Sequence, residues 1–202
     1  MATQWRIAVV TFLMFFILFE DARPVHAGKR CNGCDFDFEC EHSKKGEVCG
    51  WIPDGEAFKN QPTFGDNPKA RAREPSRHQG DHFIGGYENR QTPDDPAGAI
   101  QGDGPQGNLT SPTFRIIGTY ISFLIGGGCD QRFVRAELLV EEKKDYFRVR
   151  ETATGECSET MITKTWDVAA HKGKRAQVRL VDRSSAGWGH INFDDLRGDI
   201  RC

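Results

Sequence analysis

The stretch Gly173-Lys-Arg-Ala-Gln-Val-Arg-Leu-Val-Asp182, followed by Ser184-Ser-Ala-Gly-Trp-Gly-His-Ile-Asn-Phe-Asp-Asp-Leu-Arg-Gly198, decides the fold class of this chain. Its first half alternates apolar and polar residues, and Ala176, Val178 and Leu180 fall on one face, as a half-buried strand requires. Its second half is a loop rich in Ser and Gly, and alternation returns at Ile191 and Phe193. Two strands joined by a loop that carries an indole and an imidazole predict a β-sandwich with a binding rim.

Strand-like segments of the same kind recur upstream of this stretch. Residues 53–112 are rich in Gly, Pro, Asn and Asp and are expected to form long loops around one strand at 81–87. The other predicted strands lie at 35–39, 120–125, 134–140, 146–152, 161–168, 175–182 and 189–194. Short strands separated by turn signals predict an all-β fold, an antiparallel β-sandwich or jelly roll.

The first 27 residues have the pattern of a cleaved secretory signal. Arg6 supplies a positive charge, 7–19 is an almost uninterrupted apolar run, and Val25-His26-Ala27 fits a small-residue cleavage site. The run is too short for a membrane span of roughly 20 residues. We therefore predict a signal peptide at 1–27, a short leader at 28–34, and one β-sandwich domain at 35–202, secreted and without a membrane span.

Charge and motifs exclude several classes of function. The formal net charge is −2, and no run of Lys or Arg points to a nucleic acid or a membrane surface. The chain contains no Gly-x-Ser-x-Gly elbow, no His-Glu-x-x-His motif and no phosphate-cradling loop. These observations predict a protein that is not an enzyme and does not bind nucleic acid.

All seven cysteines follow the predicted signal, so in a secreted chain most of them should form disulfides. Cys129 and Cys157 flank a predicted hairpin and are one candidate pair, while Cys40 and Cys49 would close a short loop. Because the count is odd, one thiol is left over or links two chains into a covalent dimer.

The pair Cys31-x-x-Cys34 has the spacing of a zinc or redox motif. A second cysteine pair of matching spacing is missing, and the expected compartment is oxidising, so structural disulfides are favoured over metal binding.

A family resemblance rests on motifs that run in order through nearly the whole mature chain. The chain resembles the galactose-binding-like β-sandwich module that is appended to some bacterial levanases and related fructan hydrolases. The catalytic propeller of those enzymes is a separate domain, so the resemblance implies a carbohydrate-binding accessory module alone. The matching residues are Asp37-Phe-Glu39, Gly50-Trp51, Gly55-Glu-Ala-Phe58, Leu109-Thr-Ser-Pro112, the Ser122–Gly128 run and Gly187-Trp-Gly-His-Ile-Asn192.

A second, weaker resemblance concerns the amino-terminal part of the mature chain. Cys34-Asp-Phe, Cys49-Gly-Trp51 and Gly80-Asp-His82 are similar to the opening of MAM domains, which are adhesion modules of related architecture. Both resemblances imply a β-sandwich with an extracellular binding role.

The candidate ligand residues lie in two loops. Trp188 would present a flat indole for stacking on a sugar ring, with His190 as a hydrogen-bond donor. The alternative, which the usual burial of Trp favours, is that Trp188 plugs one end of the sandwich. In the loop after Gly126–Gly128, Asp130 and Arg132 are further candidates, since Arg suits carboxylates and sulfates, although ordinary turn chemistry is the stronger explanation there.

Two further predictions concern a metal and a modification. In galactose-binding-like sandwiches the first and last strands lie close together, which implies Glu39 and Asp195 as ligands of a structural calcium ion; solvated charge is the alternative. Asn108 opens an Asn-Leu-Thr sequon, predicted to be glycosylated in a surface loop.

The sequence therefore predicts a secreted, disulfide-stabilised, non-catalytic module that binds a glycan or an extracellular glycoprotein. The alternative is a structural protein of an extracellular or biomineral matrix, in which the odd cysteine joins chains. An enzyme related to glycoside hydrolases is the third and weakest interpretation.

Overall fold

The computed structural model describes residues 29–30, 34–41 and 45–202. The predicted signal peptide at 1–27 and Cys31 of the Cys-x-x-Cys motif lie outside the described residues, as does most of the leader. Within the described part of the chain, no helix is long and apolar enough to cross a membrane.

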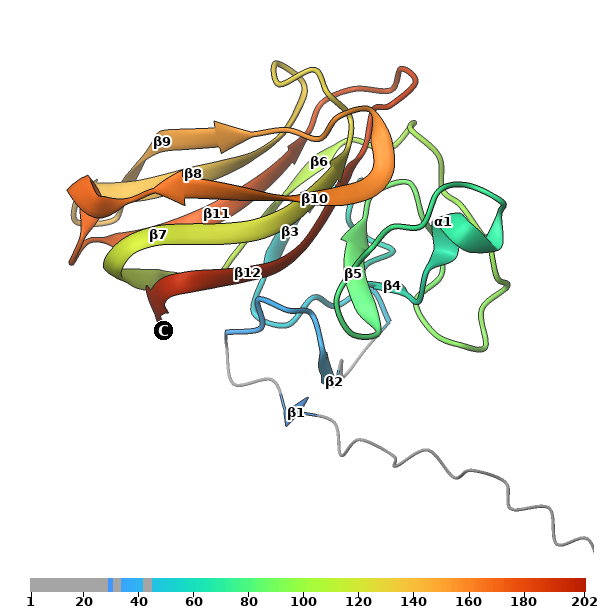
Figure 1. The fold of residues 1–202 in the computed structure, drawn as a ribbon, viewed down its shortest axis with the longest axis horizontal. Helices are drawn as coiled ribbons and strands as arrows, with labels where there is room; N and C mark the ends of the chain where they lie inside the picture. Colours follow the sequence, from blue (N-terminus) through green and yellow to red (C-terminus); the bar gives the residue numbers. More distant parts are fainter. Residues whose placement is uncertain (1–28, 31–33, 42–44) are drawn as a thin grey trace, which may run out of the picture.

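Ten strands form two antiparallel layers that face each other as a sandwich (Figure 1). One layer has the order β10–β7–β12–β5–β4, with β4 (Thr63–Phe64), β5 (His82–Gly85), β7 (Phe114–Gly127), β10 (Ser158–Asp167) and β12 (Ile191–Arg201). The other has the order β9–β8–β11–β6–β3, with β3 (Ile52–Gly55), β6 (Gly107–Thr110), β8 (Val134–Lys143), β9 (Tyr146–Ala153) and β11 (Arg175–Asp182).

Short elements complete the described fold. β1 (Lys29–Arg30) and β2 (Cys40–Glu41) pair in parallel below the sandwich. A single helical turn, α1 (Asn67–Ala70), lies in the long connection between β4 and β5, and a 3-10 turn, η1 (Ala169–His171), follows β10.

The long strand β7 connects the two layers. Its start pairs with β11 through Phe114 opposite Ala176 and Arg115 opposite Arg175. The rest of β7 lies between β10 and β12. The sheet therefore curls over along β7, and the apolar faces of both layers meet in one core.

Strand alternation predicts the core correctly. Ala176, Val178 and Leu180 are fully buried, and so are Ile191 and Phe193. In β8 the predicted inward set is also buried: Val134, Ala136, Leu138 and Val140. Side chains two residues apart lie on the same face of a strand, so each alternating run lays one continuous apolar surface on the core.

The predicted opening strand at 35–39 is wrong. Phe38 has φ 57°, in the left-handed region, and the segment bends instead of running extended. Phe36 and Phe38 are nevertheless buried, and both rings pack against Trp51, at centroid distances of 6.3 and 5.4 Å. The alternating pattern correctly indicates that the two phenyl rings are buried. A bent segment can bury them as well as a strand can, so burial does not establish an extended backbone.

Two of the described disulfides are Cys34–Cys202 and Cys129–Cys157. The second confirms the predicted hairpin pair. The predicted Cys40–Cys49 bond is wrong, because Cys40 is a buried thiol, whereas Cys49 belongs to another disulfide. A disulfide requires that the two Cβ atoms lie close and point toward each other, and closeness in sequence does not ensure this geometry.

Candidate functional site

A strained turn between β11 and β12 carries Trp188. Its φ of 62° places a bulky residue in the left-handed region, where such residues are genuine outliers. The turn is tight, because a Cβ on Gly189 would lie 2.6 Å from the carbonyl oxygens of both Ser184 and Ala186. The indole is half-buried, so it is neither a core plug nor a fully exposed platform.

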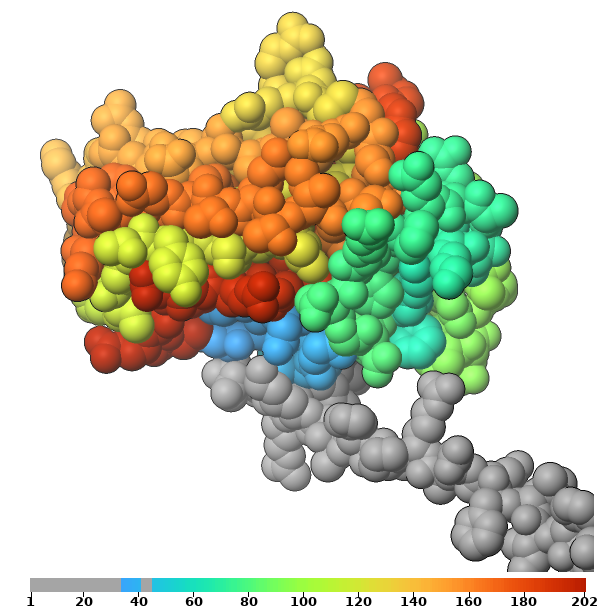
Figure 2. Space-filling view, viewed as in Figure 1, coloured from blue at the N-terminus to red at the C-terminus, as the bar shows by residue number. Residues whose placement is uncertain are grey.

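Trp188 borders an open pocket of about 320 Å³. Its walls come from three segments that are far apart in sequence: the turn after α1, the start of β10, and the Trp188 turn. In Figure 2 the teal segment after α1 lies against orange β10, with the orange-red β11–β12 loop beside them. The lining residues are Ala72, Arg73, Glu74, Cys157, Ser158, Glu159 and Trp188.

A series of stacked cations and rings supports the indole. The Arg73 guanidinium lies 5.8 Å from the centre of the Trp188 ring, and His190 lies 5.6 Å from it at an interplanar angle of 30°. Tyr87 follows at 5.1 Å from His190, and the Arg71 guanidinium lies 4.7 Å from the Tyr87 ring. Cation–π and ring contacts thus hold the Trp188 turn against the short segment 71–73.

Buried ion pairs lie beneath this stack. Arg71 Nη2 is 2.5 Å from Glu88 Oε1 and 2.7 Å from Glu159 Oε1. His190 Nδ1 is 2.6 Å from Asp103 Oδ1, and its Nε2 is 3.5 Å from Glu159 Oε2. The side chains of Glu88, Glu159 and His190 are 0, 4 and 3% exposed, so these charges depend on one another for compensation. We call these five residues the Arg71 network.

The network shifts the pKa of two of its members strongly. Burial alone would lower the pKa of His190, but the hydrogen bonds and charges of Asp103 and Glu159 outweigh it and raise that pKa to about 9. Burial would likewise raise the pKa of Glu159, but His190, Arg71 and Asn192 lower it to about 2. Both groups are therefore charged at neutral pH.

These shifts predict how stability depends on pH. The folded pKa of His190 is above its ordinary 6.5, so its stabilisation is complete below that value and is lost as the pH rises through about 9. The folded pKa of Glu159 is below its ordinary 4.5, so its stabilisation is complete above that value and is lost as the pH falls through about 2. Melting temperatures measured from pH 2 to 10 should be highest between these limits.

A His190→Gln variant supplies the control for the alkaline side. It cannot titrate, so its melting temperature should fall less between pH 6.5 and 10 than that of the wild type. Parallel curves for the two proteins would show that other groups govern the alkaline loss.

Left-handed backbone is concentrated at the pocket. Seven non-glycine residues of the described chain have positive φ, and three of them, Ala72, Cys157 and Trp188, line this one pocket. Such residues cost of order 1–3 kcal/mol each and are characteristic of ligand clamps and active sites.

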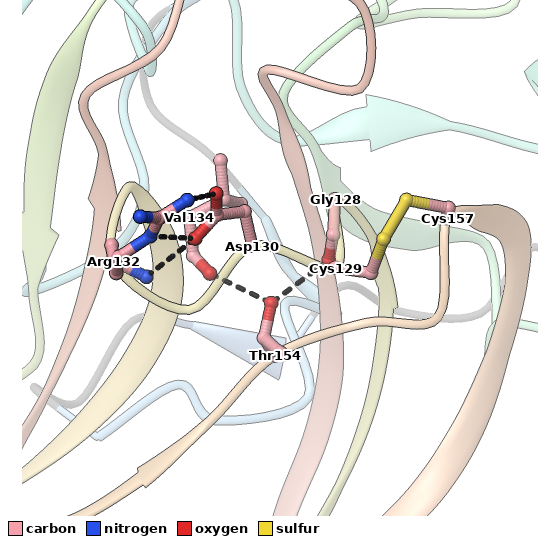
Figure 3. Close-up of a disulfide and its surroundings, with 7 residues drawn as sticks. All are labelled: Gly128, Cys129, Asp130, Arg132, Val134, Thr154 and Cys157. Carbon is pink, nitrogen blue, oxygen red and sulfur yellow. Dashed lines mark hydrogen bonds and ion pairs between the residues drawn. A yellow bond between two sulfur atoms is a disulfide. The ribbon is translucent and has the colours of Figure 1, made fainter.

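His190, the predicted hydrogen-bond donor to a sugar, is buried with its ring nitrogens facing Asp103 and Glu159 and does not line the pocket. The other predicted ligand residues lie elsewhere. Arg132 and Asp130 form a two-point ion pair with each other, at 2.9 and 2.7 Å, on an exposed loop (Figure 3). This loop follows the Cys129–Cys157 disulfide, and neither residue lines the Trp188 pocket. The nearby Thr154 hydroxyl is 2.9 Å from the Gly128 carbonyl oxygen and 2.7 Å from that of Val134, which ties the loop base to β9.

The two predicted calcium ligands have other partners. Glu39 Oε1 accepts the backbone N–H groups of Asp81 and His82, at 2.9 and 2.8 Å, and Asp195 pairs with Arg197 at 3.2 Å. Among the described residues, no group of three or more acidic, His or Cys side chains is arranged to hold a metal ion. In this structure the two carboxylates are not brought together as a shared calcium site, and calcium binding stays a prediction.

Asn108 lies within β6 rather than in a loop, which corrects that part of the glycosylation prediction. It is paired with Asp54 of β3 and Val181 of β11, and its Nδ2 donates to Asp54 Oδ2 at 3.3 Å. Glycosylation itself stays a prediction.

Most residues of the pocket and the Arg71 network were missed by sequence reasoning. Asp103 and His190 are 87 positions apart, and Arg71 and Glu159 are 88 apart. No local spacing encodes such pairs. A signal was available in Glu159, a charge that stands two residues before Met161 and therefore on the inward face of β10.

Comparison with known proteins gives one similar sequence and several similar folds. No family model matches the chain. The chain is 31% identical over 178 residues to the Aspergillus rugulosus protein named "Putative glycosyl hydrolase ecdE". That match covers 87% of this chain and 22% of the fungal protein, so the chain spans about a fifth of its relative's length.

The similar solved structures are β-proteins of low identity. TmCBM61 in complex with beta-1,4-galactotriose has a TM-score of 0.39 at 17% identity, covering 77% of this chain and 89% of that one. A family 35 carbohydrate binding module from an environmental isolate scores 0.37 at 12%, covering 82 and 93%. The K3 adhesin domain of Lys-gingipain from Porphyromonas gingivalis W83 scores 0.41 at 14%, covering 83 and 97%. The β-sandwich is established by the strand pairing of this chain itself.

Proposed function

We propose that this chain is a secreted, non-catalytic module, comprising residues 35–202, that binds a glycan in the pocket beside Trp188. The observation that carries the proposal is the strained, half-buried Trp188 on the wall of a polar pocket. An indole offers an apolar face to a sugar ring, while Ser158, Glu74 and Arg73 offer hydrogen-bond partners for its hydroxyls.

The position of the supporting groups favours binding over a purely structural role. The Arg71 network and the stack on His190 hold the turn in one conformation, which lowers the entropy cost of binding. The sequence relative is named as a glycosyl hydrolase of which this chain matches a small part, as expected for an accessory module that brings a larger enzyme to its polysaccharide.

Replacing Trp188 with alanine tests this proposal. We expect the Trp188→Ala variant to keep its fold and to lose at least about tenfold in affinity for any glycan that the wild type binds, because a central aromatic anchor contributes about 2 kcal/mol or more. The measurement is binding to a glycan array, with and without EDTA, followed by isothermal titration calorimetry. The EDTA arm also tests the calcium prediction.

Tyr120→Ala is the matched control. Tyr120 is a half-exposed aromatic residue on β7, paired with Asp167 at the opposite end of β10 from the Ser158 pocket. Its removal should leave binding unchanged. Absence of binding by the wild type, or equal losses in both variants, would contradict the proposal.

The carboxylates of the pocket support a role without catalysis. Most glycosidases need two carboxyl groups, one of which holds a proton at working pH. In this pocket Glu159 is held ionised, with a pKa of about 2, and Glu74 accepts a hydrogen bond from the Ser158 hydroxyl at 3.2 Å. We therefore expect no release of reducing sugar from levan, inulin or galactan, and measurable turnover would contradict this part of the proposal.

The alternative matrix function requires a thiol that reaches a second chain. Cys40 is 2% exposed, so it does not favour covalent joining of chains. We expect a discrete monomer band on a non-reducing gel, and a covalent ladder would favour the matrix role.

A further inference from the structure

A second hollow continues from the Trp188 pocket along the edge of β10. It has a volume of about 460 Å³, and two of its lining residues, Glu74 and Ser158, also line the Trp188 pocket. The two hollows are therefore adjacent and meet at Glu74 and Ser158, and together we call them the β10 groove. The residues of the second hollow are Glu74, Pro75, Arg77, Glu156, Ser158, Thr160 and Ile162.

Both walls of the β10 groove are fixed before any ligand binds. The Thr160 hydroxyl donates to the Pro75 carbonyl oxygen at 2.7 Å, and the Met161 N–H donates to the Ser76 carbonyl oxygen at 2.9 Å. Figure 2 shows the consequence, since the segment after α1 lies directly against the start of β10. The groove is thus a preformed feature of the surface.

Backbone strain extends along the whole groove. Arg77 has φ 56°, so it joins Ala72, Cys157 and Trp188 as the fourth left-handed residue in the lining. Four of the seven such residues in the described chain therefore line one or the other hollow of the groove. Because strained residues line both hollows, and such residues are characteristic of ligand clamps, we treat the two hollows as one functional surface.

The far end of the groove offers unused hydrogen-bond donors. Glu156 pairs with Lys164 at 3.1 Å, and Glu159 pairs with Arg71 at 2.7 Å, so these carboxylates are already compensated. In contrast, the exposed guanidinium of Arg77 has no hydrogen bond or ion pair within the described residues. Its five N–H donors can bind the oxygen atoms of a ligand that extends beyond Trp188.

We propose that the β10 groove binds a stretch of at least two consecutive sugar units of a glycan chain. Trp188 stacks on one ring, and Arg77 binds the oxygen atoms of a unit further along the chain. This inference rests on the proposed function and adds to it the ligand class: an extended oligosaccharide rather than a single sugar. Either hollow alone, at about 320 or 460 Å³, is near the small end of ligand sites.

The test is a titration series with galactan, fructan, xylan and mannan oligosaccharides of one to six units. For the glycan type that binds, affinity should rise at least about tenfold between one unit and four. The Arg77→Gly variant suits the left-handed backbone and removes the guanidinium. Its affinity for the tetrasaccharide should fall about tenfold, because the loss of a hydrogen bond to a charged group weakens binding by about that factor. Its affinity for the monosaccharide should stay unchanged.

Asp145→Gly is the matched control, because Asp145 has φ 58° on the exposed β8–β9 turn and does not line the groove. It should bind like the wild type. Trp188→Ala should weaken binding at every chain length. Equal affinity of the wild type for all lengths, or an unchanged Arg77→Gly profile, would overturn this inference while leaving the proposed function standing. Absence of binding to every probe would overturn both.

Discussion

Replacing Arg71 with methionine should lower the free energy of unfolding by about 3–5 kcal/mol. The reason is that Glu88 and Glu159, which are 0 and 4% exposed, would lose the cation that both of them contact. Glu88 would then be a buried charge without a cationic partner, and Glu159 would keep only the longer contact with His190, at 3.5 Å. Methionine retains most of the aliphatic volume, so the effect measures charge rather than packing. Urea denaturation at pH 6 supplies the measurement.

Two further variants make this result interpretable. Arg132→Met removes an arginine that also pairs with a carboxylate, but its side chain is 80% exposed, so water screens the pair and no resolvable loss of stability is expected. Adding Glu88→Gln to Arg71→Met should recover part of the stability, because one buried charge is removed. If Arg71→Met cost no more than Arg132→Met, the network would not be a stabilising element.

The second large effect concerns the disulfide between Cys34 and Cys202. It closes a loop of 168 residues, and the loop-entropy model gives a loss of about 5 kcal/mol for the Cys34→Ser/Cys202→Ser variant. The bond ties Cys34, which directly precedes the buried rings of Phe36 and Phe38, to Cys202 after β12. Denaturant unfolding of the oxidised proteins measures the loss.

The Cys129–Cys157 bond provides a comparison within the same molecule. Its loop is 28 residues long, so the same model gives a smaller loss of about 3–4 kcal/mol for the double serine variant. Cys157 also lines the Trp188 pocket, so only this second variant should weaken glycan binding. Equal stability losses would show that loop entropy does not dominate.

Stability and binding are expected to be linked in this protein. His190 stacks beneath Trp188 and also shares Glu159 with Arg71. Any change that breaks the Arg71 network should therefore loosen the Trp188 turn as well. Binding studies on network variants should be made at temperatures far below their melting points, so that the loss of binding is separated from unfolding.

Local pattern was sufficient for the longer strands of the sandwich, but the expectation of a single strand within 53–112 is wrong, because the short strands β3, β4 and β6 also lie there and are too short to show alternation. The alternation in Val134–Val140 and in Arg175–Asp182 predicts both the strand and its inward face, because a strand exposes and buries side chains with a period of two. The same rule misled at 35–39, where Phe38 adopts a left-handed conformation. Alternation reports which side chains are buried, whereas the backbone path also depends on what they pack against.

The candidate site was predicted only in part. The Gly-Trp-Gly-His turn was found, because its composition is unusual and it stands between two regular strands. Arg73, Glu159 and Arg77 were not found, because each is an ordinary charge in its own segment and acquires a role from neighbours far away in sequence.

The sequence by itself determined the longer strands from Phe114 onward, their inward faces, the Cys129–Cys157 pair and the turn that carries Trp188. These features depend on local periodicity and on nearby residues, which one chain segment contains. Only the tertiary structure decided that Trp188 is half-buried beside a groove, that Asp130 and Arg132 satisfy each other, and that His190 is charged between Asp103 and Glu159. The physical reason is that burial and electrostatic partnership depend on distances in space, and the curl of the sheet along β7 brings together residues that no spacing in the sequence connects.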